Sequence, residues 1–166
     1  GIEIFRPSGL GQRSIVDKLL GESALFSPSW YKAICNVIAD YKPHVLHVHD
    51  IWLGRAAFAA RTKQKTVMDL HENMPAAVVE YRAGYRGLQR WFRYLFHNHP
   101  RIFRHERCLL ERSDLVLAVV EEARERVLVN HPHLDPDKVV NVENLESRRF
   151  IANPRSGKAA FGKDHF

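Results

Sequence analysis

The sequence is poor in cysteine and contains no long apolar run. Two cysteines among 166 residues exclude a disulfide-stapled scaffold, because such folds need several bridges. Cys35 and Cys108 fall within apolar helical patterns, which predicts two small buried side chains in a reducing compartment. The longest apolar run in the strand regions, Leu115 to Val120, is far shorter than the ~20 residues that cross a bilayer, so no spanning helix is expected.

Acidic residues are outnumbered, and neither an internal repeat nor a low-complexity tract is present. The chain has 25 Lys and Arg against 19 Asp and Glu, a net charge of +6. This excess favours anionic partners, namely phosphates, nucleic acid or an acidic membrane surface. A hydrophobic content of 45% is ordinary for one globular domain with a real core.

The segment from Lys42 to Asn73 has the pattern of a βαβ unit. The valine-rich run His44 to His49 predicts a buried strand, and Lys65 to Leu70 predicts a second one. Between them, Ile51 to Gln64 has apolar residues at helical spacing, enough for about four turns. Polar residues follow both strands, and ligands of open parallel sheets bind beyond these carboxyl ends. The polar residues are His49 and Asp50, then His71, Glu72 and Asn73.

The rest of the chain continues the alternation of strands and helices. The remaining predicted strands are Gly1 to Arg6, Leu115 to Val120 and Lys138 to Val142. The remaining predicted helices are Arg13 to Leu20, Pro28 to Tyr41 with Ser27 as N-cap, a long region after Pro75 that breaks near Gly84, Gly87 and Pro100, and Glu121 to Val129. This order predicts an α/β fold, a Rossmann-like parallel sheet with helices on both faces.

His47, His49 and Asp50 invite a metal interpretation. The two histidines point to the same side of a strand, as two ligands of one zinc would. The further aspartate–histidine pair of the HxHxDH motif is missing, and Asp50 is well placed to cap the next helix. The sequence therefore predicts no metal site.

The region Arg82 to Arg107 contains seven arginines against one acid, with aromatic residues between them. No nucleic-acid motif accompanies it, so nucleic acid is not an expected partner. One interpretation is a basic, aromatic helix on an anionic membrane, and the other is a solvated helix with its aromatic residues in the core. The membrane-surface candidates are Arg86, Arg90, Trp91, Arg93 and Arg104.

Four segments together resemble the N-terminal domain of a GT-B glycosyltransferase, and the closest group is the retaining enzymes of glycosyltransferase family four. In chain order they are KPHVLHVHDIWLGRAAFAA, KTVMDLHEN, the acid Glu106 in HERCLLERSDLVLAV, and KVVNVENLESRRF. The resemblance covers roughly Tyr41 to Phe150. It implies that His71 is a catalytic residue that faces the donor sugar. It also implies substrate-binding positions at His49, Asp50, Glu72, Asn73 and Asn144. Asn73 could equally cap a helix, and Asn144 could simply form a turn.

The resemblance also implies partners. We expect residues 1–150 to form the acceptor-side domain without its first strand, and 151–166 to be a linker or tail towards a missing C-terminal domain. That second domain would hold most of a nucleotide-sugar donor, so no cofactor is expected in this chain. The acceptor would be a glycan or a lipid-linked molecule, and the location cytoplasmic, at the inner face of the membrane.

Two other functions fit the same fold. Nucleotide-sugar epimerases of this type tend to show a glutamate two residues after the histidine, whereas Glu72 follows His71 directly. A non-catalytic binding or scaffold domain is the other alternative. The sugar, the nucleotide and the acceptor are not specified by the sequence.

Overall fold

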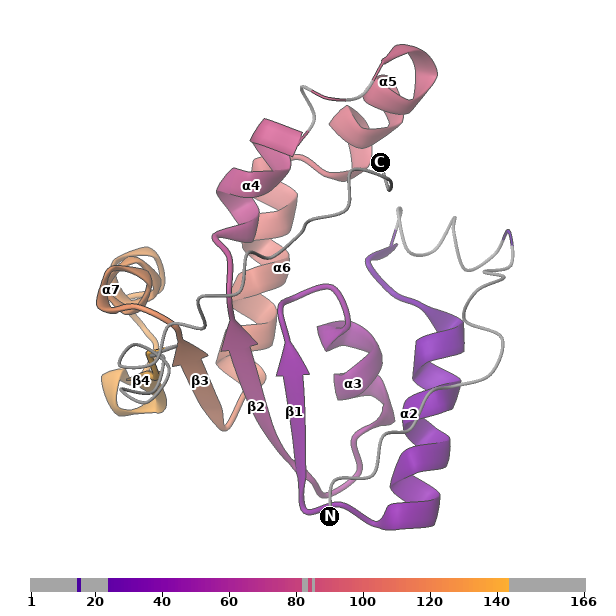
Figure 1. The fold of residues 1–166 in the computed structure, drawn as a ribbon, viewed down its shortest axis with the longest axis vertical. Helices are drawn as coiled ribbons and strands as arrows, with labels where there is room; N and C mark the ends of the chain where they lie inside the picture. The colour runs from indigo at the N-terminus through magenta and orange to yellow at the C-terminus, as the bar shows by residue number, and fades with distance from the viewer. Residues whose placement is uncertain (1–14, 16–23, 82–83, 85, 144–166) are drawn as a thin grey trace, which may run out of the picture.

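The computed structural model describes residues 15, 24–81, 84 and 86–143, and their core element is a parallel sheet (Figure 1). Its four strands are hydrogen-bonded in the order β1-β2-β3-β4. They are β1 (Val45–His49), β2 (Lys65–Leu70), β3 (Leu115–Ala118) and β4 (Val139–Asn141). The fold is α/β and Rossmann-like, as predicted. The predicted strand Gly1 to Arg6, nearly all of the predicted helix Arg13 to Leu20, Asn144 and the tail 151–166 lie outside the described residues.

Helix α2 (Pro28–Tyr41) begins and ends as its sequence predicts. The Ser27 hydroxyl accepts the Trp30 N–H at 3.4 Å, and Pro28 occupies the first turn, where a missing N–H costs nothing. At the other end, Lys42 adopts a left-handed conformation (φ 48°) and its N–H bonds Ile38 O. The helix packs beside α3 (Gly54–Ala60), and Ala33 is its only buried side chain.

Helix α3 is about half as long as predicted. Ile51 is apolar because it enters the core before the helix starts, so it is fully buried without being helical. After the helix, the Gln64 side chain accepts the Thr62 N–H at 2.9 Å and closes a turn before β2. Gly54 lets α3 approach α6 closely, since a Cβ there would lie 2.5 Å from Leu109 Cδ1.

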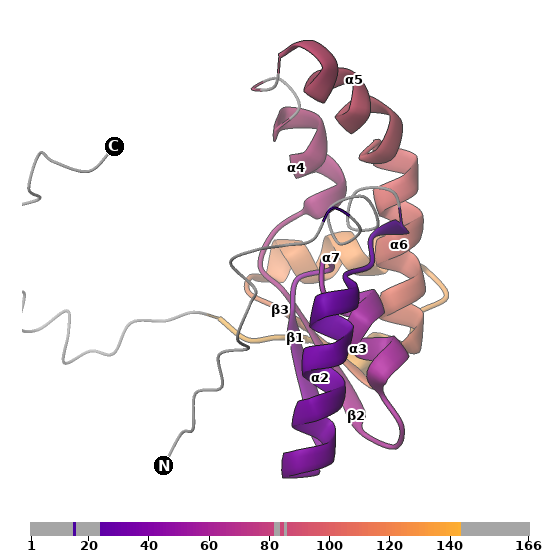
Figure 2. The ribbon, with the colours of Figure 1, turned by 90° about the vertical axis from the view of Figure 1, so that its right-hand side faces the viewer.

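In the described part of the connection from β2 to β3 there are three α-helices, namely α4 (Met74–Tyr81), α5 (Gly87–Phe96) and α6 (His99–Arg112). The predicted break at Pro100 is confirmed, because Asn98 caps α6 by accepting the Arg101 N–H at 3.1 Å and Pro100 lies in the first turn. Helices α4 and α6 lie side by side, and α5 extends beyond them, away from the sheet (Figures 1 and 2).

Helix α7 (Glu121–Asn130) connects β3 to β4 through a short 3₁₀ turn, η2 (Pro136–Lys138). The predicted helix is confirmed, and Glu121 and Glu122 occupy its first turn, where negative charge suits the helix dipole. Strand β3 stops at Ala118, two residues earlier than predicted, because Val120 is already the N-cap of α7.

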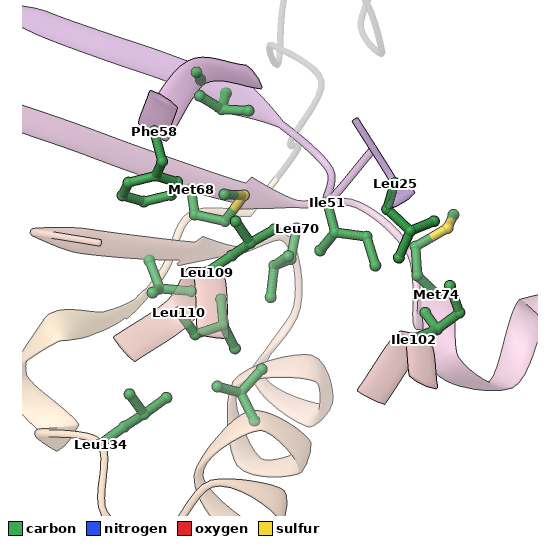
Figure 3. Packing of buried hydrophobic residues seen from close by; sticks show 14 of the residues in the cluster. Leu25, Ile51, Phe58, Met68, Leu70, Met74, Ile102, Leu109, Leu110 and Leu134 are labelled. Carbon is green, nitrogen blue, oxygen red and sulfur yellow. The ribbon is translucent and has the colours of Figure 1, made fainter. Parts of the chain in front are cut away.

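The core lies on one face of the sheet. Alternate strand residues such as Val48, Met68 and Val116 pack there against apolar side chains of α3, α6 and α7. Figure 3 shows this packing, with Phe58 of α3 and Leu109 of α6 near Met68. The opposite face is only partly covered by the described residues, since Leu115 and Leu117 are half-buried.

Two burial predictions were wrong. Strand β1 is not buried on both faces, because it is an edge of the described sheet; Val48 is buried while Val45 is 48% exposed. The two free cysteines are not core residues either. Cys35 is half-buried on the peripheral helix α2, and Cys108 is exposed on a face of α6 that lines a hollow.

Candidate functional site

Four side chains of β1 and β2 meet at the carboxyl edge of the sheet. The strands are parallel and pair His49 with Asp69 and His47 with Val67. Side chains two residues apart on a strand share a face, so His47 and His49 lie on the same side as Asp69 and, just beyond β2, His71. We call these four residues the strand-end cluster.

Asp69 is the centre of the strand-end cluster. Its Oδ2 lies 3.0 Å from His47 Nε2, 3.2 Å from His49 Nδ1 and 3.1 Å from His71 Nε2. His49 Nδ1 is also 3.2 Å from His71 Nε2, and the rings of His47 and His49 are stacked with centroids 4.8 Å apart. One carboxylate oxygen therefore connects three imidazoles.

The strand-end cluster combines an anion with three accessible imidazoles. Burial alone would raise the pKa of Asp69, but hydrogen bonds from His71 and His47 and the nearby imidazole charges outweigh it, so the pKa lies below its usual value. The Asp69 side chain is only 11% exposed, whereas those of His47, His49 and His71 are 47%, 66% and 35% exposed. A ligand can reach the rings from solvent.

Asp50 fixes the backbone on which His71 sits. Its Oδ1 accepts the His71 N–H at 3.1 Å, and its own N–H bonds Asp69 O at 2.8 Å. Asp50 adopts a left-handed conformation (φ 53°), which aspartate tolerates better than most residues. The predicted capping of the next helix is wrong, because α3 begins only at Gly54 and its N-cap is Leu53.

Glu72 and Asn73 are both exposed beside the strand-end cluster but bond within the chain. Glu72 Oε2 accepts the Tyr81 hydroxyl at 3.0 Å, and this bond raises the pKa of Tyr81. Asn73 starts α4, since its side chain accepts the Ala76 N–H at 3.4 Å. Asn73 thus caps α4, which was one of its two predicted roles.

The chain matches the model of a known protein family. The model of the family described as Glycosyltransferase Family 4 matches residues 8–144, most of the chain. The chain belongs to glycosyltransferase family 4. A comparison with curated proteins found no match. In this family 4 domain, the strand-end cluster occupies the carboxyl edge of the Rossmann-like sheet, where such folds hold ligands.

Glu106 of the family 4 domain is structural. It is fully buried on α6, with Oε1 3.1 Å from Arg126 Nη1 and 3.2 Å from His131 Nε2. The resemblance depended partly on this acid. It connects α6 to the end of α7 through Arg126 and His131.

The basic, aromatic region of the family 4 domain lies on α5 and α6. Trp91 is 59% and Tyr94 is 68% exposed, so these two aromatic residues are not in the core. Arg86 and Arg104 are exposed as well. Arg90 and Arg93 lie on α5, but their side chains are outside what the structure describes. None of the described helices combines the length and apolar character needed to cross a bilayer.

Arginines also surround a hollow of about 630 Å³ between α3 and α6, which we call the arginine groove. Its basic lining is Arg55, Arg101, Arg104 and Arg112. Burial, followed by the charges of Arg55 and Arg104, lowers the pKa of Arg101. Among the described residues, no carboxylate forms an ion pair with Arg55, Arg104 or Arg112. The groove is therefore electropositive.

Two features of the site were missed from the sequence. Asp69 lies inside a strand and was not recognised as the partner of the histidines. The repeated spacing, HxH in β1 and DxH at the end of β2, was the available signal. Arg55 and Arg112 were missed because they reach the arginine groove from different helices.

Proposed function

We propose that this chain is the acceptor-side domain of a retaining glycosyltransferase. The enzyme would move a sugar from a nucleotide-sugar donor to a glycan or lipid-linked acceptor. A second Rossmann-like domain of the same protein would hold the nucleotide. The nucleotide-sugar donor would therefore bind to the intact two-domain enzyme. The membership in family 4 supports the transfer of a sugar.

The observation that carries this proposal is the strand-end cluster at the carboxyl edge of the sheet. Polar side chains from two neighbouring strands converge there, on strands that are held rigidly by the sheet. In GT-B enzymes the cleft between the two domains contains the reaction. An edge with accessible imidazoles and carboxylates is suited to face such a cleft, since sugars are recognised through their hydroxyl groups.

His71 is the proposed catalytic residue. Its Nε2 is held by Asp69, which leaves Nδ1 for a sugar hydroxyl and fixes the angle of the ring. During transfer the bond from the anomeric carbon to the nucleotide phosphate oxygen breaks, a bond to the acceptor oxygen forms, and the acceptor proton passes to the departing phosphate. Positive charge develops on the sugar, and the carboxylates of Asp69 and Asp50 beside His71 would stabilise it.

His49, Asp50, Glu72 and Asn73 are the proposed substrate-binding residues around His71. His49 has the most exposed imidazole of the strand-end cluster, and it is the best placed to contact a hydroxyl directly. Glu72 can exchange its bond with Tyr81 for one with a substrate. Asn144 remains a substrate-binding prediction.

A lipid-linked acceptor suits the basic side of the molecule. The arginine groove offers guanidinium groups to a phosphate, and arginine binds phosphates through paired N–H groups. The exposed Trp91 and Tyr94 on α5 would rest at the headgroup level of an anionic membrane. We place the protein at the cytoplasmic face of such a membrane. Two free cysteines, one of them exposed, suit that reducing compartment.

His71→Ala in the full-length protein tests the proposed function. Loss of one hydrogen bond to the sugar should cost about 1–3 kcal/mol, roughly ten- to a hundredfold in turnover. Nucleotide affinity should stay nearly unchanged, because His71 touches the sugar and not the nucleotide. Turnover is measured as nucleotide released from a panel of nucleotide-sugars, with product analysis to separate transfer from epimerisation.

The control is His133→Ala, since His133 pairs with Glu111 at the surface and lies outside the strand-end cluster. This variant should keep the wild-type rate. A wild-type rate in His71→Ala, with the fold intact by circular dichroism, would contradict the site assignment. The 166-residue chain alone is expected to be inactive, because the reactants cannot be positioned without the nucleotide-binding half. Turnover by that chain would overturn the two-domain part of the proposal.

A further inference from the structure

The strand-end cluster has the ligands of a metal site. The sequence argued against a metal because the HxHxDH motif was incomplete and Asp50 was expected to cap the next helix. The parallel register brings Asp69 from the next strand directly opposite His49. The pair His47 and His49 therefore becomes a set of three donors on the same face of the sheet.

The distances suit a small cation. The donor atoms of His47, His49 and Asp69 all lie within 4.8 Å of one another, and each histidine nitrogen is 3.0–3.2 Å from Asp69 Oδ2. In a tetrahedral zinc site with bonds of about 2.0–2.1 Å, neighbouring ligand atoms are separated by roughly 3.3 Å. The two contacts with Asp69 would therefore change by only tenths of an ångström if an ion took the centre, whereas the stacked rings of His47 and His49 would have to turn so that their donor atoms come closer together.

The surroundings also favour a cation. The carboxylate of Asp69 is nearly buried while the rings of His47 and His49 are open to solvent, which gives an ion a route of entry. Asp50 and Glu72 add two further carboxyl groups next to the strand-end cluster. Among the described residues, no lysine or arginine forms an ion pair with these three acids. This edge is thus locally acidic in a basic protein.

We propose that His47 Nε2, His49 Nδ1 and the Asp69 carboxylate bind one zinc-class divalent ion. Two imidazoles and one carboxylate suit Zn²⁺ or Co²⁺, whereas Mg²⁺ and Ca²⁺ prefer all-oxygen sites. Three protein ligands leave the fourth position open to solvent, as in zinc sites that exchange a ligand. His71 Nε2 lies 3.1 Å from Asp69 Oδ2 and 3.2 Å from His49 Nδ1, so it is close to two of the three ligands without being needed to complete the set.

Metal binding by the intact protein tests this proposal, without any sugar present. The protein is stripped with a chelator, dialysed and titrated with Zn²⁺ by calorimetry at pH 7, and with Co²⁺ by visible absorption. We expect one equivalent of Zn²⁺, a tetrahedral Co²⁺ spectrum and no binding of Mg²⁺. His49→Ala and Asp69→Asn should each weaken Zn²⁺ binding at least tenfold. His49 is 66% exposed, so its replacement should leave the fold intact.

Two variants serve as controls. His133→Ala removes a surface histidine paired with Glu111 and should bind Zn²⁺ as the wild type does. His71→Ala should also retain one equivalent, which separates the metal site from the proposed catalytic role of His71. The absence of stoichiometric Zn²⁺ in the wild type would overturn the proposal. Equal Zn²⁺ affinity in His49→Ala and His133→Ala would also overturn the proposal. The strand-end cluster would then be only a group of hydrogen-bonded side chains.

Discussion

His105 is buried on α6 and is held neutral by its surroundings. Its Nε2 donates to Ile51 O at 2.9 Å. Burial lowers the pKa of His105 to about 4, and the charges of Arg55 and Arg101 act in the same direction, against the bond to Ile51. The ring therefore connects α6 to the chain just after β1 as a neutral donor.

The buried His105 predicts a loss of stability in mild acid. Its pKa is about 4 in the folded protein and about 6.5 in an unfolded chain. The folded state thus binds the proton less readily, so the stability is complete above about pH 6.5 and is lost as the pH falls towards 4. Between pH 7 and pH 5 the wild type should lose about 2 kcal/mol more than His105→Gln. Urea unfolding of both proteins at both pH values measures this difference. An equal loss in the two proteins would mean that His105 does not carry the effect.

At the strand-end cluster, sequence and structure agree on some residues and not on others. His49, Asp50 and His71 could be expected at the site, because polar residues just beyond parallel strands are a local signal. Asp69 could not, since it lies within the run VMDL and its role depends on pairing with β1. Because β1 and β2 are joined by a crossover with α3 and not by a short turn, the residue opposite His49 cannot be counted off along the sequence.

At the level of elements, Glu106 joins α6 to the end of α7. The ion pair with Arg126 and the contact with His131 come from the last two turns and the C-cap of α7. All three side chains are largely withdrawn from solvent, so the polar contacts of Glu106 Oε1 are with Arg126 and His131. Removal of one member leaves the others buried without compensation.

Glu106→Ala should therefore be strongly destabilising. We expect a loss of about 3–5 kcal/mol in the free energy of unfolding, the range for breaking a buried ion pair. The control is Arg107→Ala, which breaks the exposed pair between Arg107 and Glu111 on the same helix and should cost only about 0.3–0.5 kcal/mol. Denaturant unfolding compares the two variants. A cost for Glu106→Ala no larger than that of the control would show that this contact does not hold α6 to α7.

Most helices and strands could be predicted from the sequence, but their lengths were predicted less accurately. Helix α2 was predicted to the residue because Ser27 and Pro28 are strong local start signals. Helix α3 was predicted too long because Ile51 and Gln64 match the helical spacing but serve a core contact and a turn. Burial of β1 was overestimated, since an edge strand and a central strand can have the same composition.

On the scale of the whole molecule, basic residues gather on α5 and α6, towards the end of the sheet at which β1 and β2 finish. Helix α5 extends away from the sheet (Figure 1). Trp91 and Tyr94 on this helix are exposed, and Arg86 precedes it in the sequence. The loop with Lys63 lies at the opposite end of the sheet, just before β2. The molecule is therefore suited to meet an anionic surface with one end.

The protein should bind anionic vesicles more strongly than neutral ones, and less strongly at high salt. Each arginine near such a surface contributes about 1 kcal/mol, so the double variant Arg86→Ala, Arg104→Ala should bind roughly thirtyfold more weakly. Lys63→Ala, at the opposite end, should bind as the wild type does. Co-sedimentation at low and high salt measures this. Equal binding to anionic and neutral vesicles would contradict this prediction. Helix α5 would then be a solvated helix without a role at membranes.

The strand order has a consequence for how the chain folds. Strands β1 and β2 are joined by residues 50–64, whereas β2 and β3 are joined by 71–114, a connection roughly three times as long. For a flexible chain, closing the longer connection costs about 1 kcal/mol more entropy. The two strands that carry the strand-end cluster are thus the pair that the chain can bring together at the lower entropic cost. The strand-end cluster, with its proposed roles in sugar and metal binding, therefore lies on the strand pair with the shortest connection.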